Sequence, residues 1–207
     1  MKKIITRRSL FLYCALFIVS IKSTLSSEFR LYTHKIGKEN AKIHIKEYFS
    51  LTCSHCANFH LLTFPKIKEE MIDTGLLKFE FVDYPLDRLA MIAVALVRSL
   101  PNESYLDAIN ILFKNQKEWA YSNKPLDELL NMAKIFGISK QSFDKIIENY
   151  DLMQKVLDKM EEDSKRHDIQ STPTFIINNK YKISGTVSFE SFKKKLNKFI
   201  PIKNLNG

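Results

Sequence analysis

The chain has 207 residues, of which 45% are hydrophobic and 12% aromatic, with only five glycines and six prolines. This composition excludes a disordered or loop-rich chain and supplies the core of one domain, or of one domain with a large insertion. The formal net charge of +9 does not predict nucleic-acid binding, because five positive charges lie in residues 1–27, which contain no acid, and the remaining +9 − 5 = +4 are spread over the rest of the chain.

The first 27 residues have the order of an export signal. Basic residues within 2–8 precede an apolar run over 10–21, and small polar residues follow up to Ser27. The apolar run is shorter than the about 20 residues that span a membrane. We therefore expect residues 1–27 to be a signal peptide and the mature protein to be periplasmic or otherwise extracytoplasmic. An uncleaved membrane anchor is the alternative.

The next part of the chain predicts a strand, a helix and a second strand. Residues 42–49 alternate apolar and polar side chains and then become apolar, which is typical of a strand that enters the core. Residues 57–71 have helical spacing; we expect Pro65 to kink this helix and Gly75 to cap its end. Residues 76–82 alternate again, so this order predicts a right-handed crossover between parallel strands.

Only helices are predicted between residues 87 and 166. Helical spacing occurs in five segments, namely 89–100, 103–113, 123–137, 139–150 and 152–166. We expect Asn123 and Ser139 to cap the third and fourth of these helices, with Pro125 in the first turn of the third. The single tryptophan, Trp119, lies between predicted helices and is expected to pack rather than to bind a ligand.

The chain then returns to β-structure. Residues 174–177 and 181–184 flank a turn over 178–180, whose asparagines tolerate the left-handed conformation of a tight hairpin. Residues 188–199 form a final amphipathic helix. The order βαβ, helical block, ββα predicts an α/β thioredoxin fold with a helical insertion. The predicted division is 28–86 and 167–207 for the thioredoxin-like domain and 87–166 for the insertion.

Cys53 and Cys56 are the two cysteines that remain if Cys14 leaves with the signal peptide, and they stand where the first predicted strand passes into a helix. A disulfide across two intervening residues closes too small a loop to stabilise the fold much, so we expect this pair to react. Unpaired N–H groups and the helix dipole in the first turn favour an anion. We therefore expect the pKa of Cys53 to lie below the about 8.5 of a free cysteine, with His55 donating to its sulfur or adding a positive charge.

Two further features are candidates for the same site. Glu47 lies six residues before Cys53 and, if it faces the core, could relay the proton that Cys56 gains or loses during disulfide exchange. A solvated strand residue is the alternative. Thr172 and Pro173 stand just before a predicted strand, and a cis bond there would expose the Thr172 backbone for pairing with an extended substrate segment.

These residues resemble the DsbA-like branch of the thioredoxin superfamily over essentially the whole mature length. The resemblance is carried by EYFSLTCSHC at 47–56, by STPTFIIN at 171–178 and by the place of the helical insertion. It implies an oxidase for reduced or unfolded exported proteins, a buried Glu47, a cis Thr172–Pro173 bond facing the cysteines, and reoxidation by a membrane quinone-linked partner. Ser54 departs from the best-known oxidases, which have proline there, so the resemblance does not fix the redox potential.

Other readings of the cysteine pair stay open. A structural zinc site needs four ligands, and near the cysteines only His60, four residues after Cys56, is even loosely spaced as one. We expect His60 and His167 to be surface or packing residues. An exported thiol-capturing holdase without turnover and an isomerase or reductase of the same fold are the alternative functions, whereas glutathione-using relatives usually lack the second cysteine. We expect no cofactor, no metal and no nucleic-acid partner, and we expect a monomer.

Overall fold

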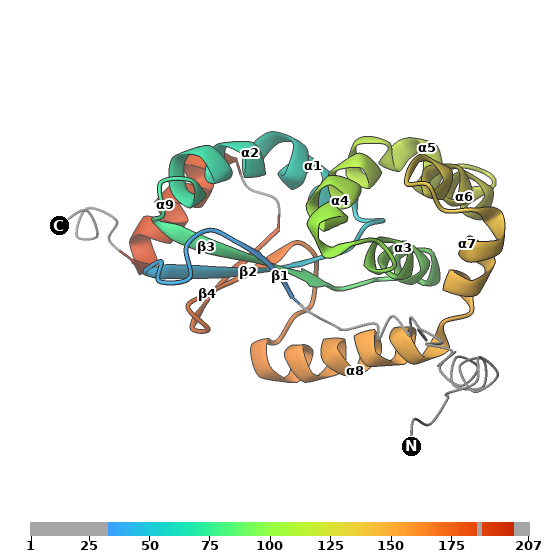
Figure 1. The fold of residues 1–207 in the computed structure, drawn as a ribbon. Coiled ribbons are helices and arrows are strands. Elements are labelled where there is room, and N and C mark those ends of the chain that lie inside the picture. The colour runs from blue at the N-terminus through green and yellow to red at the C-terminus, as the bar shows by residue number, and fades with distance from the viewer. Residues whose placement is uncertain (1–32, 186–187, 201–207) are drawn as a thin grey trace, which may run out of the picture.

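The structure is a computed structural model that describes residues 33–185 and 188–200 (Figure 1). The predicted signal peptide, residues 1–27, lies outside the described residues. Within the described ranges, no helix combines the length and the apolar character needed to cross a membrane.

A five-stranded mixed sheet runs through the centre of the fold, with the strand order β1-β3-β2-β4-β5. The strands are β1 (His34–Ile36), β2 (Ile43–Phe49), β3 (Leu77–Asp83), β4 (Thr174–Ile177) and β5 (Tyr181–Ser184). β2 and β3 are parallel, whereas β1, β4 and β5 run antiparallel to their neighbours. The predicted crossover and the C-terminal hairpin are confirmed. β1 was not predicted, because three residues are too few to show an alternating pattern.

The hairpin between β4 and β5 turns through two asparagines with positive φ, 48° at Asn178 and 54° at Asn179, as the sequence predicted. Asn178 also connects this hairpin to β2, because its side-chain carbonyl accepts a hydrogen bond of 2.7 Å from the backbone N–H of His44. This contact helps to hold β4 in register with β2, the strand that leads to the cysteines.

The helix that follows β2 alternates between α-helical and π-helical turns. Its α-helical parts are α1 (Ser54–Asn58) and α2 (Phe64–Ile67), and its π-helical parts are Phe59–Thr63 and Lys68–Ile72. Pro65 lies in the first turn of α2, between the two π-helical stretches. A proline has no N–H to donate to the preceding turn. The kink at Pro65 stays a prediction. Gly75 ends the helix with φ +82°, as predicted.

The helices between β3 and β4 run from residue 88 to residue 167. They are α3 (Arg88–Arg98), α4 (Tyr105–Lys114, after a 3₁₀ turn at Asn102–Ser104), α5 (Gln116–Ala120), α6 (Pro125–Ile135), α7 (Lys140–Ile147) and α8 (Tyr150–His167). Figure 1 shows α1, α2 and the last helix, α9 (Phe189–Phe199), on one side of the sheet and α8 on the other side. Helices α3 to α7 lie together beside the sheet.

Two predictions in this helical region were wrong in detail. The sequence did not predict α5, which is only five residues long; it contains Trp119, whose side chain is fully buried and donates a hydrogen bond of 2.8 Å to the carbonyl oxygen of Leu112. Asn123 does not cap α6, whose N-cap is Lys124 without a side-chain hydrogen bond. The packing role of Trp119 is confirmed.

Replacing each of the two predicted cap residues with alanine should show which of them caps a helix. Ser139→Ala is expected to lower the free energy of unfolding by about 1 kcal/mol, because the Ser139 hydroxyl accepts a hydrogen bond of 3.1 Å from the backbone N–H of Ser142 at the start of α7. Asn123→Ala, the matched control, is expected to change it by less than about 0.5 kcal/mol. Urea unfolding of both variants measures the difference; equal losses would contradict the assignment of the cap.

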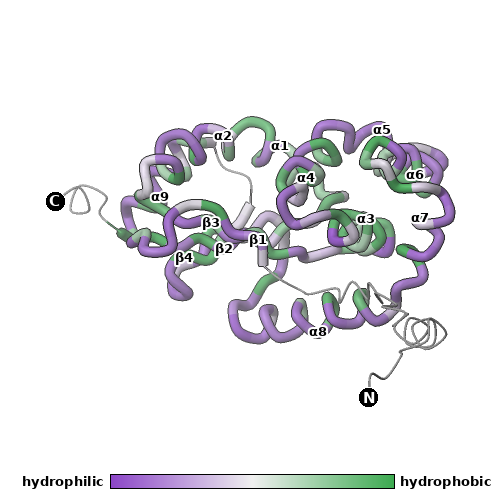
Figure 2. The backbone as a smooth tube through the Cα atoms, viewed as in Figure 1, coloured by the Kyte–Doolittle hydropathy of each residue, from purple (hydrophilic) through white to green (hydrophobic). Residues whose placement is uncertain are grey.

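The helical region is joined to the sheet through a buried polar cluster. α3 is buried almost all round, and Figure 2 shows it as mostly hydrophobic, in contrast to the hydrophilic α8. Its last residue, Arg98, forms a buried ion pair with Asp83 at the end of β3. The hydroxyl of Tyr105 on α4 donates a hydrogen bond of 2.9 Å to the same carboxylate. Three elements therefore meet at Asp83, which fixes the helices next to the end of the sheet where the cysteines lie.

Candidate active site

Cys53 and Cys56 lie at the junction between β2 and α1. β2 ends at Phe49, and a turn closed by the hydrogen bond from the Cys53 N–H to the Ser50 carbonyl, 3.1 Å, places Cys53 at the N-cap of α1. Cys56 follows within the first turn and is fully buried, whereas Cys53 is half-buried. Both cysteines are free thiols in this structure. The Cys53 sulfur can therefore react with a thiol of another protein, whereas the buried Cys56 sulfur can react only with Cys53.

The pKa of Cys53 is lowered to about 5. The largest cause is the hydrogen bond that its sulfur receives from the Cys56 thiol, and the Thr172 side chain and the backbone N–H groups of Cys56 and His55 add to it, while partial burial of the sulfur opposes it. Backbone N–H groups at a helix start have no partner within the helix and can stabilise an anion. At pH 7 a thiol with this pKa is almost entirely thiolate.

Burial raises the pKa of the Cys56 thiol well above its ordinary value. The hydrogen bond that it donates to Cys53 and the negative charge of Glu47 act in the same direction. Cys56 therefore keeps its proton under conditions in which Cys53 has lost its own. The two sulfurs are distinguished by their surroundings although they stand only three positions apart in the chain.

Thr172 and Pro173 face Cys53 from the loop before β4. Their peptide bond is cis, and the Cys53 sulfur lies 3.4 Å from the carbonyl oxygen of Thr172. The neighbouring residue, Thr174, pairs with Tyr48 near the end of β2, so the sheet itself brings this loop to the cysteines. The Thr172 hydroxyl is buried, and its interaction with the Cys53 sulfur is among those that lower the pKa of that sulfur.

Glu47 is fully buried and points into the core on the same side of the sheet as the cysteine helix. Its Oε2 atom lies 3.0 Å from Nε2 of His60. The alternative of a solvated strand residue is therefore wrong. His60, expected to be a surface or packing residue, is instead the buried hydrogen-bond partner of Glu47. Its position four residues after Cys56, one helical turn later on the same face, was the signal in the sequence.

His55 has an exposed side chain. The contact through which it lowers the pKa of Cys53 is made by its backbone N–H. The predicted role of the imidazole itself, as donor or positive charge beside the sulfur, stays a prediction.

Residues of the helical region hold the active-site loop in place, and the sequence did not reveal them. The Gln116 amide donates hydrogen bonds to the backbone carbonyls of Leu51, at 2.7 Å, and Cys53, at 3.1 Å. The Thr52 hydroxyl donates to Asp87 at 2.6 Å, and the Tyr121 hydroxyl donates to the Thr52 carbonyl at 2.9 Å. These partners lie more than 30 positions away in the chain, so no local pattern could connect them to the cysteines.

The described residues contain no cluster of three or more histidine, cysteine, aspartate or glutamate side chains arranged to hold a metal ion. The zinc alternative therefore lacks a ligand set in this part of the chain.

Comparisons with known proteins agree with this geometry. The family model described as thioredoxin matches residues 30–198. The crystal structure of Wolbachia pipientis alpha-DsbA1 superposes with a TM-score of 0.72 at 29% identity, covering 82% of this chain and 91% of that one. Disulfide bond formation protein D of Bacillus subtilis is 28% identical over 79% of this chain and 75% of its own length.

A Rickettsia typhi protein whose name assigns it provisionally to the protein-disulfide oxidoreductases is 27% identical over 69% of this chain. The match covers 53% of that protein, so the chain spans about half the length of this curated relative. The family match over most of the chain and the likeness to alpha-DsbA1 place this protein in the thioredoxin family, among its DsbA-like members.

Proposed function

We propose that this protein is an exported thiol–disulfide oxidoreductase that acts as an oxidase and transfers the Cys53–Cys56 disulfide to reduced or unfolded exported proteins. The proposal rests above all on the opposite pKa shifts of the two thiols, lowered to about 5 for Cys53 and raised for Cys56. Stabilising the thiolate stabilises the reduced enzyme, and a disulfide whose reduced form is stabilised is a strong oxidant.

The chemistry follows from thiolate exchange. A substrate thiolate attacks the Cys53 sulfur of the oxidised enzyme, which breaks the internal disulfide, forms a mixed disulfide and releases Cys56, which takes up a proton. A second substrate thiolate attacks the substrate sulfur of the mixed disulfide and expels Cys53 as a thiolate. The substrate loses two electrons to the enzyme, and Cys53 is a good leaving group because its pKa is low.

Four neighbouring residues support these steps in the proposal. Glu47 exchanges the proton that Cys56 gains and loses; its charge already acts on that thiol. Thr172 and Pro173 receive the substrate, since the Thr172 carbonyl oxygen lies 3.4 Å from the Cys53 sulfur. His55 assists Cys53.

The cellular setting is part of the same proposal. The signal-like sequence at residues 1–27 supports export to the periplasm or another extracytoplasmic compartment, where disulfides persist. A membrane quinone-linked oxidase would return the enzyme to its disulfide form, as the resemblance implies. The protein would act as a monomer without a cofactor.

The test measures the Cys53 pKa and the redox equilibrium on the same protein. The rate of Cys53 alkylation against pH should have its midpoint near pH 5. The reduction potential of the Cys53–Cys56 disulfide should be equal to or higher than that of the glutathione pool. A disulfide far more reducing than glutathione would indicate a reductase. Failure to accelerate oxidation of a reduced, unfolded test protein, with binding intact, would indicate a thiol-capturing holdase.

A further inference from the structure

A carboxylate and an imidazole form a buried pair in the core. Nε2 of His60 lies 3.0 Å from Oε2 of Glu47, and both side chains have an exposure of 0%. Among the residues that the structure describes, Oε1 of Glu47 and Nδ1 of His60 are buried without a hydrogen-bond partner. Within this part of the chain each side chain therefore has one hydrogen-bond partner, the other, and Oε1 of Glu47 is left for a further contact.

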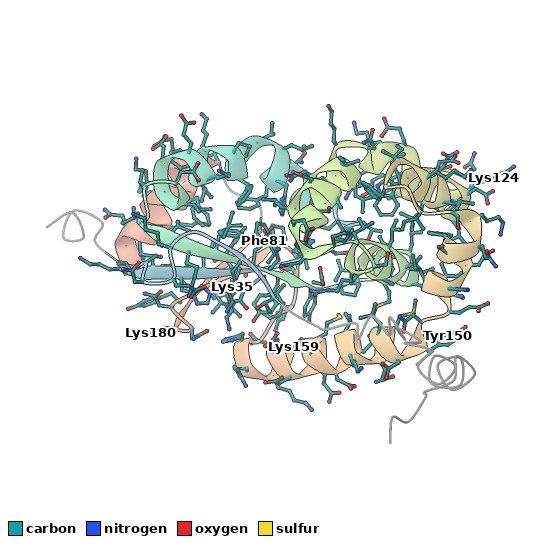
Figure 3. All side chains as sticks on the ribbon, viewed as in Figure 1. Lys35, Phe81, Lys124, Tyr150, Lys159 and Lys180 are labelled. Carbon is teal, nitrogen blue, oxygen red and sulfur yellow. The ribbon has the colours of Figure 1, made fainter. Side chains whose placement is uncertain are left out.

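Five phenylalanine rings lie against the His60 ring. The His60 ring is stacked on Phe113, with centroids 4.4 Å apart, and four more phenylalanines have centroids within 6 Å of it, namely Phe49, Phe59, Phe64 and Phe81. Phe81, labelled in Figure 3, lies in the interior, whereas Lys124 and Lys180 lie at the outer edges of the molecule. A buried carboxylate needs a hydrogen-bond donor to compensate for the loss of water, and these rings supply none.

The other ionisable groups that face this pair do not supply that donor. Cys56 and Cys53 on the active-site helix are sulfur acids, and burial together with the charge of Asp83 raises the pKa of Tyr105 on α4, so its phenol stays neutral. Tyr105 donates its hydrogen to Asp83, which is in turn paired with Arg98. The last helix, α9, contributes apolar Phe192 to the ring system around Phe59.

We propose that His60 is a positioning residue of disulfide exchange: its Nε2–H donates to Oε2 of Glu47, which holds the carboxylate in place and leaves Oε1 to exchange a proton with the Cys56 sulfur. This inference rests on the proposed oxidoreductase function and on the proton role of Glu47 within it. The negative charge of Glu47 already acts on Cys56, and both side chains belong to the same side of the sheet.

The step balances in protons and electrons. In the mixed disulfide, the Cys56 thiol gives its proton to the Glu47 carboxylate and attacks the Cys53 sulfur. The Cys53–Cys56 bond forms, the bond from Cys53 to the external sulfur breaks, and that sulfur leaves as a thiolate with the electron pair. In the opposite direction the protonated Glu47 returns its proton to Cys56. His60 holds the hydrogen bond to Glu47 throughout and touches neither sulfur.

The experiment follows reduced protein with oxidised glutathione by rapid quenching from pH 5.5 to pH 8.5. The first step, attack by Cys53, depends on glutathione concentration, and the second, attack by Cys56 within the mixed disulfide, does not. His60→Phe keeps an aromatic ring but removes the donor, and it should slow the second step at least about tenfold at pH 7, within the range general-base catalysis contributes. In this variant the rate of the second step should then increase about tenfold per pH unit, because Cys56 must lose its proton to solvent.

The first step should stay within about twofold of the wild-type rate, because the thiolate of Cys53 is stabilised elsewhere. His60→Gln should bring the second step back to within about threefold, since the amide N–H can replace the ring donor. The matched control is His44→Phe, which removes a histidine paired at 2.7 Å with Glu80. His44 projects from the opposite face of β2, so both steps should be unchanged in this variant.

The outcomes separate the two proposals. A second step in His60→Phe with the wild-type rate and pH profile would overturn the positioning role, and so would a His60→Gln variant as slow as His60→Phe, which would leave the ring a packing function only. A wild-type first step no faster than that of a free cysteine would instead contradict the proposed oxidoreductase function.

Discussion

Replacing Cys53 with serine is expected to reduce the oxidation of a reduced, unfolded test protein to the rate given by the buffer oxidant alone. A hydroxyl cannot form the mixed disulfide, and Cys56, with an exposure of 0%, cannot be reached by a protein thiol in its place. The loss should therefore be complete rather than partial. Thiol loss in the test protein, with oxidised glutathione as the oxidant, measures it.

The matched substitution, Cys56→Ser, should fail in a different way. Cys53 keeps its position at the start of α1 and can still react, but nothing inside the protein can release the mixed disulfide. Covalent adducts of Cys53 with substrate should accumulate and be visible on non-reducing gels or by mass spectrometry. Full activity of Cys56→Ser in a dithiol assay would contradict the division of roles between the two sulfurs.

Reduction of the disulfide is expected to make the protein more stable to unfolding at pH 7, by a pH-dependent contribution of about 2–3 kcal/mol from the Cys53 thiolate. The folded pKa of about 5 is lower than the about 8.5 of an unfolded cysteine. The contribution is therefore complete above about pH 8.5, declines by about 1.4 kcal/mol per pH unit below that, and is lost as the pH falls through about 5.

Comparison of reduced wild type with reduced Cys53→Ser isolates this contribution below about pH 8.5, because Cys56, whose pKa burial raises, keeps its proton in the folded and the unfolded protein over that range. The difference between their free energies of unfolding, from urea titrations at pH 4, 5.5, 7 and 8.5, should grow with pH in the stated window. A difference that stays constant over this range would mean that Cys53 ionises like a free cysteine, and the proposed oxidase chemistry would lose its basis.

Strands, turns and helix ends that depend on neighbouring residues could be predicted from the sequence. Alternation of side chains predicted β2 and β3, two asparagines predicted the turn with positive φ, and Gly75 predicted the end of a helix. Each of these features depends on residues close in sequence, whose backbone preferences act before any tertiary contact forms. The short elements β1 and α5 were not predicted, because three or five residues are too few to show a periodic pattern.

The chain also determined which residues stand at the site: two cysteines at a strand–helix junction, an acid six residues earlier, and a threonine–proline pair far along the sequence. Only the tertiary structure decided what surrounds them. It brings Thr172 to within 3.4 Å of the Cys53 sulfur, buries Glu47, and gives that carboxylate His60 as its partner. Burial and distance depend on contacts across the sheet, and these contacts set the pKa values on which the chemistry depends, because desolvation and hydrogen bonding act through space and not along the chain.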